Sequence, residues 1–385
     1  MWCRWIISPA NSMHWSDQFS SQLISQDSPS IVNGASSLVM ETVEGKAPRR
    51  LDEGDEAAVR QSLLRMNLLT SNGSATFLPL TGGVSSLIVL VDAGGRRFCF
   101  KRALEKLNVA AEWYAPVARN RAEVQWMNSA NAILPGIAPE VLGQDLTCDA
   151  FAMAYLDSVQ FPLWKSELLS GRIMQRVAAA VALALVRIHS YTARCDEVKT
   201  RFANAEQFHA LRIEPYLLAT AKMNPVVAKQ LIQIATQTAE TRRVLVHGDV
   251  APKNILIGGP HGVVLLDAEC ATCGDPAFDL AFCVNHLLLK MLVRPHEALH
   301  LGDAASALVN VYCSRIDWEP VASFDARLLG LLPALMLARV DGKSPVDYLN
   351  EKQRTTTRKF AREALERPPQ TFAQMSSQWF GQVQE

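Results

Sequence analysis

The sequence predicts an α+β protein with two lobes, a β-rich N-terminal lobe followed by a mostly helical C-terminal lobe. Strand-like segments separated by glycine-containing turns fill residues 77–101. After Pro162 the pattern becomes helical, and residues 172–192 form a long run rich in alanine and leucine. Short strands return near residue 244 before helices resume. Because 49% of the residues are hydrophobic, such a chain can bury a large core.

The first 50 residues contain ten serines and no clear periodicity, which predicts a disordered extension ahead of the folded unit. A helix is expected over residues 52–67, and another over 119–132, ending before Pro135-Gly136. Strands are expected at 77–80, 87–92, 97–101 and 151–156, the first two flanking the loop TGGVSS at 81–86. These elements define an N-terminal lobe over residues 51–157.

The C-terminal lobe is expected over residues 158–367, with a tail over 368–385. Its helix at 172–192 carries apolar residues around much of its circumference, which is typical of a buried helix. Strands are predicted at 244–246, 254–257 and 263–266, the last two joined by the turn sequence GGPHG. Helices then continue from Asp279 to about Glu366.

Composition excludes several classes of protein. The formal net charge is zero, so no basic surface field indicates a nucleic-acid partner. The longest apolar runs fall short of the roughly 20 residues of a membrane span. Eight scattered cysteines, with a single CxxC at Cys270 and Cys273, favour a reduced compartment over a disulfide framework or a zinc site. We therefore expect a cytoplasmic protein without nucleic-acid or membrane partners.

The residues that carry chemistry lie in VHGDVAPKNILIGGPHGVVLLDAECATCGDPAFDLAF, residues 246–282. Asn254 follows Asp249 by five positions, and Asp267 ends the next apolar strand. Phosphoryl transfer requires a carboxylate that orients the attacking hydroxyl and hard oxygen ligands for Mg²⁺. Singly, each residue is typical of a turn or strand end; together, and joined by a hairpin turn, they indicate phosphoryl transfer.

This stretch resembles the catalytic and metal loops of the aminoglycoside-phosphotransferase and choline-kinase superfamily, which shares the protein-kinase fold. The resemblance extends from about Leu78 to about Leu349. FKRALEKLNVAAEW, RNRAEVQWM and LARVDGKSPVDYL are similar to a bacterial phosphotransferase branch, with methylthioribose kinase more distant. The resemblance implies ATP and Mg²⁺. It implies that Asp249 is the catalytic base and that Asn254 and Asp267 hold Mg²⁺. By the same resemblance, His247 would brace the catalytic loop and Asp279 would tether it.

In the N-terminal lobe, Lys101 would pair with the α- and β-phosphates, held by a carboxylate on the next helix. Glu123 is our choice for that carboxylate, and Glu112 is the alternative. The loop residues Gly82, Gly83 and Ser85 would cover phosphates with backbone amides. Backbone groups of Ala154 and Leu156 would pair with adenine. Glu269 would reach a second metal or a loop amide, and the sequence does not decide between them.

Polar residues within apolar helices are candidates for binding the hydroxyl substrate, although each also fits an ordinary core hydrogen bond or helix cap. They are Arg212, Glu214, Tyr216, Asn285, His286, Arg339 and Asp341. An aminoglycoside is polycationic and would need an acidic pocket, and no acidic cluster occurs after Asn350. A sugar or amino alcohol is therefore favoured over an antibiotic.

We predict an ATP-dependent kinase that phosphorylates a hydroxyl of a small molecule. The alternative is a nucleotide-binding pseudokinase that acts as an interaction module. Against it, Lys101, Asp249, Asn254 and Asp267 are all present. A protein kinase is disfavoured because the loop lacks the arginine of H-R-D and no long activation segment follows LLDAE.

Overall fold

The computed structural model describes residues 51–80, 85–106 and 116–384. The described residues belong to one compact unit, which contains both predicted lobes. The expected disordered extension over residues 1–50 lies outside the described residues.

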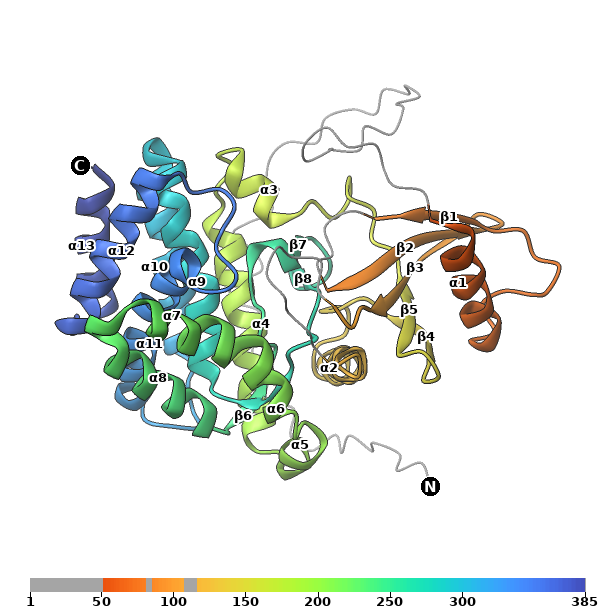
Figure 1. The fold of residues 1–385 in the computed structure, drawn as a ribbon, viewed down its shortest axis with the longest axis horizontal. Coiled ribbons are helices and arrows are strands. Elements are labelled where there is room, and N and C mark those ends of the chain that lie inside the picture. The colour runs from red at the N-terminus through yellow and green to blue at the C-terminus, as the bar shows by residue number, and fades with distance from the viewer. Residues whose placement is uncertain (1–50, 81–84, 107–115, 385) are drawn as a thin grey trace, which may run out of the picture. The chain divides into compact units, whose positions relative to one another are not determined.

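The N-terminal lobe is built on a five-stranded antiparallel sheet with the order β1-β2-β3-β5-β4 (Figure 1). Strand β3 lies at its centre, so that Lys101 is paired with Ile88 on one side and Phe151 on the other. The strands are β1 (Thr76–Pro79), β2 (Ser86–Ala93), β3 (Arg96–Ala103), β4 (Val141–Asp145) and β5 (Ala150–Ala154).

Two helices flank this sheet. Helix α1 (Glu53–Arg65) begins at Asp52, whose side chain accepts from the amide of Asp55 at 2.7 Å, and it buries Val59 and Leu63 against a small core with the sheet. Helix α2 (Arg119–Ile133) contributes Trp126 and Met127 to the main core of the protein. The helix that carries Glu123 is thereby packed between the sheet and the C-terminal lobe.

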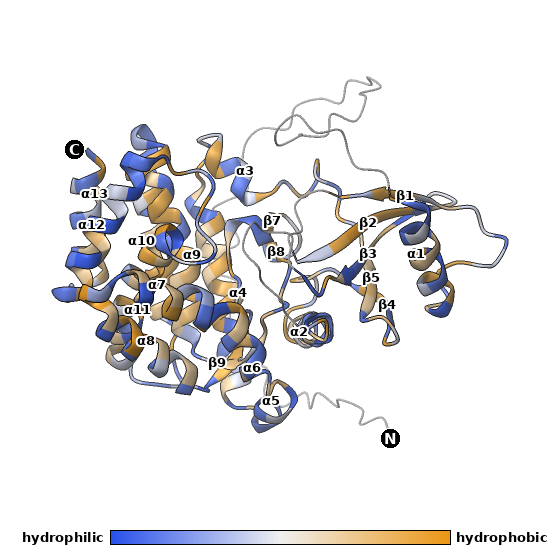
Figure 2. Ribbon diagram, in the orientation of Figure 1, coloured by the Kyte–Doolittle hydropathy of each residue, from blue (hydrophilic) through white to orange (hydrophobic). Residues whose placement is uncertain are grey.

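The C-terminal lobe is a helical assembly around α9, in which every residue from Pro276 to Met291 is buried. Figure 2 shows hydrophobic residues concentrated on strand β2 and helix α4. The larger helices are α4 (Gln175–Ala193), α8 (Ala228–Glu240), α9 (Pro276–Val293), α10 (Ala298–Cys313), α11 (Val321–Asp341), α12 (Glu351–Glu366) and α13 (Phe372–Gln384). Shorter ones are α3 (Trp164–Leu169), α5 (Asp196–Arg201), α6 (Ala205–Phe208) and α7 (Ala219–Met223).

By length and composition, α9 and α11 are the two helices among the described residues that are apolar enough to cross a membrane. Most of each is buried inside the fold, 89% and 67% of the tested windows. This is the property of core helices, so the pattern by itself gives little support for a membrane span.

Two short antiparallel pairs hold the catalytic segment. Strand β6 (Val244–Val246) pairs with β9 (Thr272–Gly274), and β7 (Ile255–Ile257) pairs with β8 (Val263–Leu265). Before them, residues His209–Leu218 form a π-helix, η2, that contains Pro215. A wider helical turn tolerates a proline that has no amide hydrogen to donate.

The predicted two-lobe α+β fold is confirmed, with three differences in detail. Strands β4 and β9 were not predicted. The segment assigned to a tail, residues 368–385, instead contains α13 (Phe372–Gln384), which buries Met375 and Trp379 in the C-terminal lobe. The indole of Trp379 donates to the carbonyl of Leu288 at 2.8 Å, so this helix belongs to the lobe.

Candidate active site

The loop after β6 is fixed by Asp279 at the start of α9. The two oxygens of this fully buried carboxylate accept from the amides of His247 and Gly248 at 2.7 and 2.8 Å. Gly248 has a φ of +77°, and a Cβ there would lie 2.7 Å from the carbonyl oxygen of Cys270. A side chain is therefore excluded at this position. The structure gives Asp279 the tethering geometry that the resemblance implied.

His247 connects the loop to the strand that precedes Asp267. Its Nδ1 accepts from the amide of Asp249 at 3.2 Å, and its Nε2 lies 3.0 Å from the carbonyl of Leu266. Because Nδ1 accepts, Nε2 carries the proton and donates. Burial lowers the pKa of His247, which favours this neutral form. His247 thus connects the Asp249 loop to the strand before Asp267, and it contacts the backbone amide of Asp249.

The carboxylate of Asp249 is surrounded by three donors. Its Oδ2 lies 2.8 Å from Nδ2 of Asn254 and 3.1 Å from both the Arg212 guanidinium and the Lys253 ammonium. Burial alone would raise the pKa of Asp249, but the charges of Arg212 and Lys253 outweigh it and lower the pKa. Asp249 is therefore ionised at neutral pH, with Oδ2 engaged by its neighbours.

Lys253 is a residue that the sequence reasoning missed. Its side chain is 45% exposed, in contrast to Arg212 at 6%, so it reaches Asp249 from the solvent side. The available signal was its position four residues after Asp249 in the same loop.

Lys101 joins the two lobes. Its Nζ lies 2.7 and 2.9 Å from the two carboxylate oxygens of Glu123 and 2.5 Å from Oδ1 of Asp267. The Lys101 and Glu123 side chains are 2% and 1% exposed. The structure thus brings together three of the predicted residues, and it gives Lys101 the partner that we chose. The alternative, Glu112, lies outside the described residues.

The buried charges near Lys101 are mainly negative. Burial raises the pKa of Glu123 to about 7, with the Lys101 charge opposing it and the charges of Asp267 and Glu269 adding to it. Burial and Asp267 also raise the pKa of Glu269. The carboxyl groups of Glu123, Asp267 and Glu269 lie close enough to repel one another. An added cation would therefore stabilise this cluster.

Glu269 is held by Arg119 at the start of α2. Its Oε2 lies 2.9 Å from Nε of Arg119, which is fully buried. The same guanidinium donates to the carbonyls of Ser85 and Leu104, each at 2.5 Å. Neither alternative expected for Glu269 describes this contact, since its partner is a side chain of the N-terminal lobe. Arg119 was also missed by the sequence reasoning.

Asn254 and Asp267 offer oxygens that suit Mg²⁺. Asn254 directs Nδ2 toward Asp249, so its Oδ1 faces away from that carboxylate. Asp267 is 25% exposed and has a φ of +66°, a left-handed conformation that is uncommon for aspartate and frequent at functional sites. Among the described residues, no three His, Cys, Asp or Glu side chains form a metal cluster. Mg²⁺ commonly uses one or two protein oxygens together with phosphate oxygens, so the two residues fit it.

The expected nucleotide contacts are described in part. Gly82 and Gly83 lie outside the described residues. Ser85 is buried, with its carbonyl accepting from Arg119 and from the amide of Leu104. The amide of Ala154 donates to the carbonyl of Glu140 at 2.8 Å, so it is used within the protein rather than left for adenine. Leu156 follows β5 and is half-buried.

The four predicted substrate candidates lie on η2, α9 and α11. Arg212 contacts Asp249 itself, and Glu214 forms an ion pair with Lys343 at 2.8 Å. His286 and Arg339 are both buried, on α9 and α11. The other candidates are Tyr216, which accepts from Arg339, Asp341, which pairs with Arg358, and Asn285, which is fully buried.

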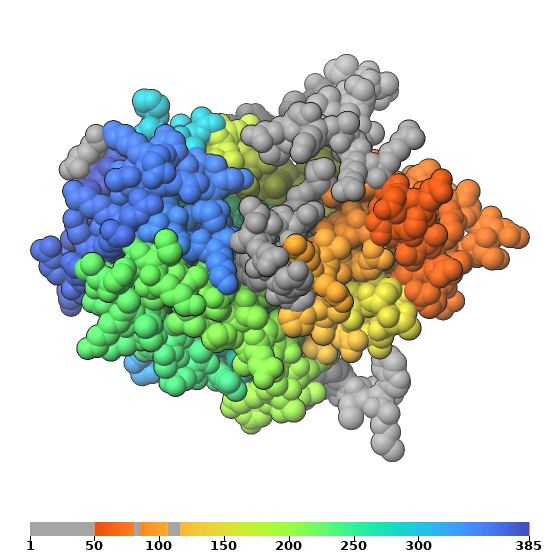
Figure 3. Space-filling view, in the orientation of Figure 1, coloured from red at the N-terminus to blue at the C-terminus, as the bar shows by residue number. Residues whose placement is uncertain are grey.

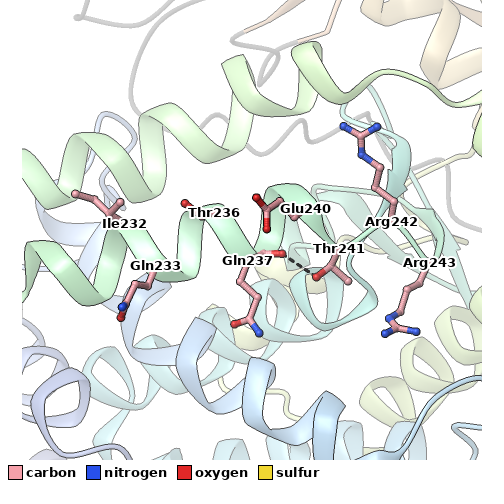
Figure 4. Close-up of a pocket in the computed structure, with 8 residues that line it drawn as sticks. All are labelled: Ile232, Gln233, Thr236, Gln237, Glu240, Thr241, Arg242 and Arg243. Atoms are coloured by element: carbon pink, nitrogen blue, oxygen red, sulfur yellow. Dashed lines mark hydrogen bonds between the residues drawn. The ribbon is translucent and has the colours of Figure 1, made fainter.

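A surface depression lies along α8 and the segment after it, lined by residues of 232–243 (Figure 4). Within it, the hydroxyl of Thr241 donates to the carbonyl of Gln237 at 2.7 Å. None of its lining residues belongs to the catalytic segment. In the space-filling view of Figure 3, the green region that contains α8 lies on the C-terminal lobe. The depression is thus separate from the cluster of charged residues around Asp249 and Lys101, which is the candidate active site.

Comparison with known proteins gives one family match. A model described as the phosphotransferase enzyme family matches residues 76–324, more than half of the chain. No curated protein matches the chain.

Solved structures of similar fold include several kinases. An ethanolamine kinase of Plasmodium vivax is 14% identical, covering 74% of this chain and 81% of its own, with a TM-score of 0.46. An aminoglycoside phosphotransferase of Alicyclobacillus acidocaldarius is 14% identical, covering 88% and 98%, also at 0.46. A choline kinase of Streptococcus pneumoniae is 14% identical, covering 82% and 99%, at 0.43.

Proposed function

Because the chain belongs to the phosphotransferase enzyme family over residues 76–324, we propose that it transfers the γ-phosphate of ATP to a hydroxyl group of a small metabolite, with Asp249 as the base. The family membership agrees with the resemblance found in the loop motifs. It makes the chain an ATP-dependent phosphotransferase with an alcohol group as acceptor. The residue roles and the use of Mg²⁺ are the proposal.

The observation that carries the proposal is the contact between Lys101 and Asp267. These residues are 166 positions apart, yet Nζ of Lys101 lies 2.5 Å from Oδ1 of Asp267. Burial lowers the pKa of Lys101, but Asp267 and Glu123 outweigh it and raise the pKa, so the ammonium stays charged. A fixed cation beside a partly exposed carboxylate is the arrangement that binds the phosphates of a metal–nucleotide complex.

The proposed chemistry assigns each residue one task. The substrate hydroxyl would donate to Asp249 and lose its proton to that carboxylate as its oxygen attacks the γ-phosphorus, while the bond from that phosphorus to the bridging oxygen breaks and ADP leaves. Arg212 and Asn254 hold Oδ2 of Asp249, which leaves Oδ1 to meet the hydroxyl. Lys253 reaches the same carboxylate from the solvent side, where a transferring phosphoryl group would pass. Mg²⁺, held by Asn254 and Asp267, would neutralise charge on the phosphates.

Binding of nucleotide tests the proposal. A thermal-shift titration compares Mg²⁺-ATP, Mg²⁺-GTP and ATP without metal on the wild type, Asp267→Ala and Asp249→Asn. A ligand at 100 times its dissociation constant stabilises by about 2.7 kcal/mol. We expect a metal-dependent shift in the wild type and in Asp249→Asn, and a reduced shift in Asp267→Ala. No shift with any nucleotide would contradict the proposed site.

A pseudokinase remains the second candidate, because nucleotide binding alone would fit it as well. The presence of Lys101, Asp249, Asn254 and Asp267 together favours an active enzyme. The two candidates differ in turnover. A pseudokinase would bind Mg²⁺-ATP without forming ADP, whereas the proposed kinase forms ADP at a rate that Asp249→Asn lowers.

A further inference from the structure

Two buried cations of the C-terminal lobe form no ion pair within the part of the chain that the structure describes. Arg339 on α11 is 8% exposed, and its Nη1 donates only to neutral groups, the hydroxyl of Tyr216 and the Oγ and carbonyl of Ser344. Lys290 on α9 is 1% exposed, its Nζ donates to the carbonyl of His286 at 3.5 Å, and it lies 4.7 Å from the ring centroid of Tyr348. Burial lowers the pKa of Lys290 to about 7, so an anion beside it would favour its charged form. A buried charge without a carboxylate partner is costly, so its presence calls for an explanation.

Unpartnered polar atoms accompany these cations. Nε of Arg339 and Nε2 of His286 are both buried and find no hydrogen-bond partner among the described residues. Nδ1 of His286 lies 3.2 Å from the hydroxyl of Tyr348. If the tyrosine donates to Nδ1, the histidine carries its proton on Nε2 and becomes a donor. Buried polar atoms are nearly always hydrogen-bonded, so these two atoms are free to bond to a ligand.

The region adjoins the proposed catalytic base. The Arg339 guanidinium lies 5.5 Å from the ring centroid of Tyr216, and the Arg212 guanidinium lies 5.6 Å from the same ring. Arg212 in turn contacts Asp249. Burial lowers the pKa of His286, and the charges of Arg339 and Lys290 lower it further, while Asp249 opposes them. His286 therefore lies close enough to Arg339, Lys290 and Asp249 for all three charges to affect its pKa.

The nearby charges leave a positive excess. Asp249 is already balanced by Arg212 and Lys253, Glu214 by Lys343, and Asp341 by Arg358. Arg339 and the protonated form of Lys290 have no ion-pair partner among the described residues. A polycationic acceptor would be repelled here, whereas an anionic group would satisfy both the charge and the unpartnered donors.

We propose that Arg339, His286 and Lys290 bind an anionic group, a carboxylate or a phosphate monoester, on the molecule whose hydroxyl is phosphorylated. The inference rests on the proposed kinase function and assigns its substrate class. The anion would lie on the α9–α11 side of Asp249. Binding there would hold the acceptor with its hydroxyl toward the nucleotide. Arg339 is the main ligand, since its guanidinium keeps an unused donor at Nε.

The test uses small probes while the nucleotide site is filled with Mg²⁺ and a non-hydrolysable ATP analogue. Thermal shifts are measured with glycerate, glycerol 3-phosphate, glycerol and ethanolamine at equal concentration and ionic strength. We expect at least one of the two anions to stabilise the wild type beyond glycerol and ethanolamine. Whether glycerate or glycerol 3-phosphate gives the larger shift distinguishes a carboxylate from a phosphate.

The variants are Arg339→Met and Lys290→Met, with Lys222→Met on an exposed position of α7 as the control. Loss of a charged hydrogen bond should weaken anion binding about 10- to 100-fold in the first two and leave it unchanged in the control. Lys290→Met is expected to fold, because it removes a buried charge and keeps a side chain of similar shape.

The shift with the ATP analogue is recorded for every variant, which separates this inference from the proposed function. Its absence in the wild type contradicts the nucleotide site. Its presence, with neither anion exceeding glycerol, overturns the anion site. A larger shift with ethanolamine than with either anion, or equal anion shifts in wild type, Arg339→Met and Lys290→Met, also overturns it.

Discussion

Replacing Arg212 by methionine distinguishes two interpretations of this residue. The sequence suggested a substrate contact, whereas the structure places the guanidinium 3.1 Å from Oδ2 of Asp249. Nε of Arg212 also donates to the carbonyl of Gly248 at 2.6 Å. A residue that positions the base should affect the chemical step with any acceptor, including water. A substrate contact should affect only the binding of the acceptor.

The size of the effect follows from the geometry. At an effective dielectric constant of about 20, two unit charges at this separation interact by about 5 kcal/mol. Lys253 remains beside Asp249 in the variant, so the pKa of Asp249 should rise, but by less than the full interaction with Arg212 would give. Asp249 stays ionised at neutral pH in the variant, so the effect there comes from lost positioning: we expect intrinsic ATP hydrolysis to fall about 10- to 100-fold, part of the help that a positioned general base supplies.

The pH dependence of the rate should shift in a defined direction. The pKa of Asp249 is low in the wild type, so the base stays ionised until the pH is strongly acidic. Without Arg212 the pKa is higher, and the acid limb of the rate profile should move to higher pH. The assay measures ADP release against pH with Mg²⁺-ATP. A folded Arg212→Met protein with the wild-type rate and an unshifted acid limb would refute the reasoning. Arg212→Lys, which keeps the charge, controls for folding.

Three further predictions concern other residues of the site. Lys253→Met should lower ADP release about 10-fold or more while changing urea stability by less than about 1 kcal/mol, because its side chain is 45% exposed; equal loss in Lys222→Met would contradict a specific role. Asp279→Ala should lower the free energy of unfolding by about 3 to 6 kcal/mol, because two hydrogen bonds to a charged group, of about 1.5 to 3 kcal/mol each, are lost. A urea midpoint equal to that of the wild type would argue against the tether. The raised pKa of Glu123, about 7, means that the folded state holds its proton more tightly than the unfolded state, so stability without nucleotide should fall as the pH rises from about 4.5 to about 7. Glu123→Gln should flatten that slope in pH-dependent melting, and an unchanged slope would exclude Glu123 as its source.

Much of the fold was predictable because its elements have strong local patterns. The central strands show the alternation of a half-buried sheet, and α4 shows the apolar run of a core helix. Strand β4 escaped because its pairing with β5 shifts register between Val141 and Gly143, and a bulge disrupts the alternation. Helix α13 could have been found from Met375 and Trp379, which are four positions apart and both buried.

The site was less predictable than the fold. The roles of Lys101 and Glu123 came from resemblance, because no local pattern says that residues on different elements meet. Arg212 shows the limit most clearly. Its contact with Asp249 joins residues 37 positions apart, and its direction depends on the π-helical turns of η2. An ordinary helix of 3.6 residues per turn would point the same residue elsewhere.

Contacts between the lobes set the other limit. Arg119 and Glu269 are 150 positions apart, and each belongs to a segment whose own pattern predicts a helix end or a loop. Their pairing depends on how α2 packs against the catalytic segment. Such long-range contacts follow from the tertiary structure, so a single sequence does not contain a local signal for them.

The most direct test of the central claim is the phosphorylation of a metabolite extract with ATP labelled with ¹⁸O on the γ-phosphate, followed by mass spectrometry. The wild type should produce at least one labelled phosphate ester, and Asp249→Asn should produce it about 10²- to 10⁴-fold more slowly. Labelled products formed at equal rates by both proteins would contradict the role of Asp249. Labelled inorganic phosphate without any labelled ester would contradict transfer to a metabolite hydroxyl.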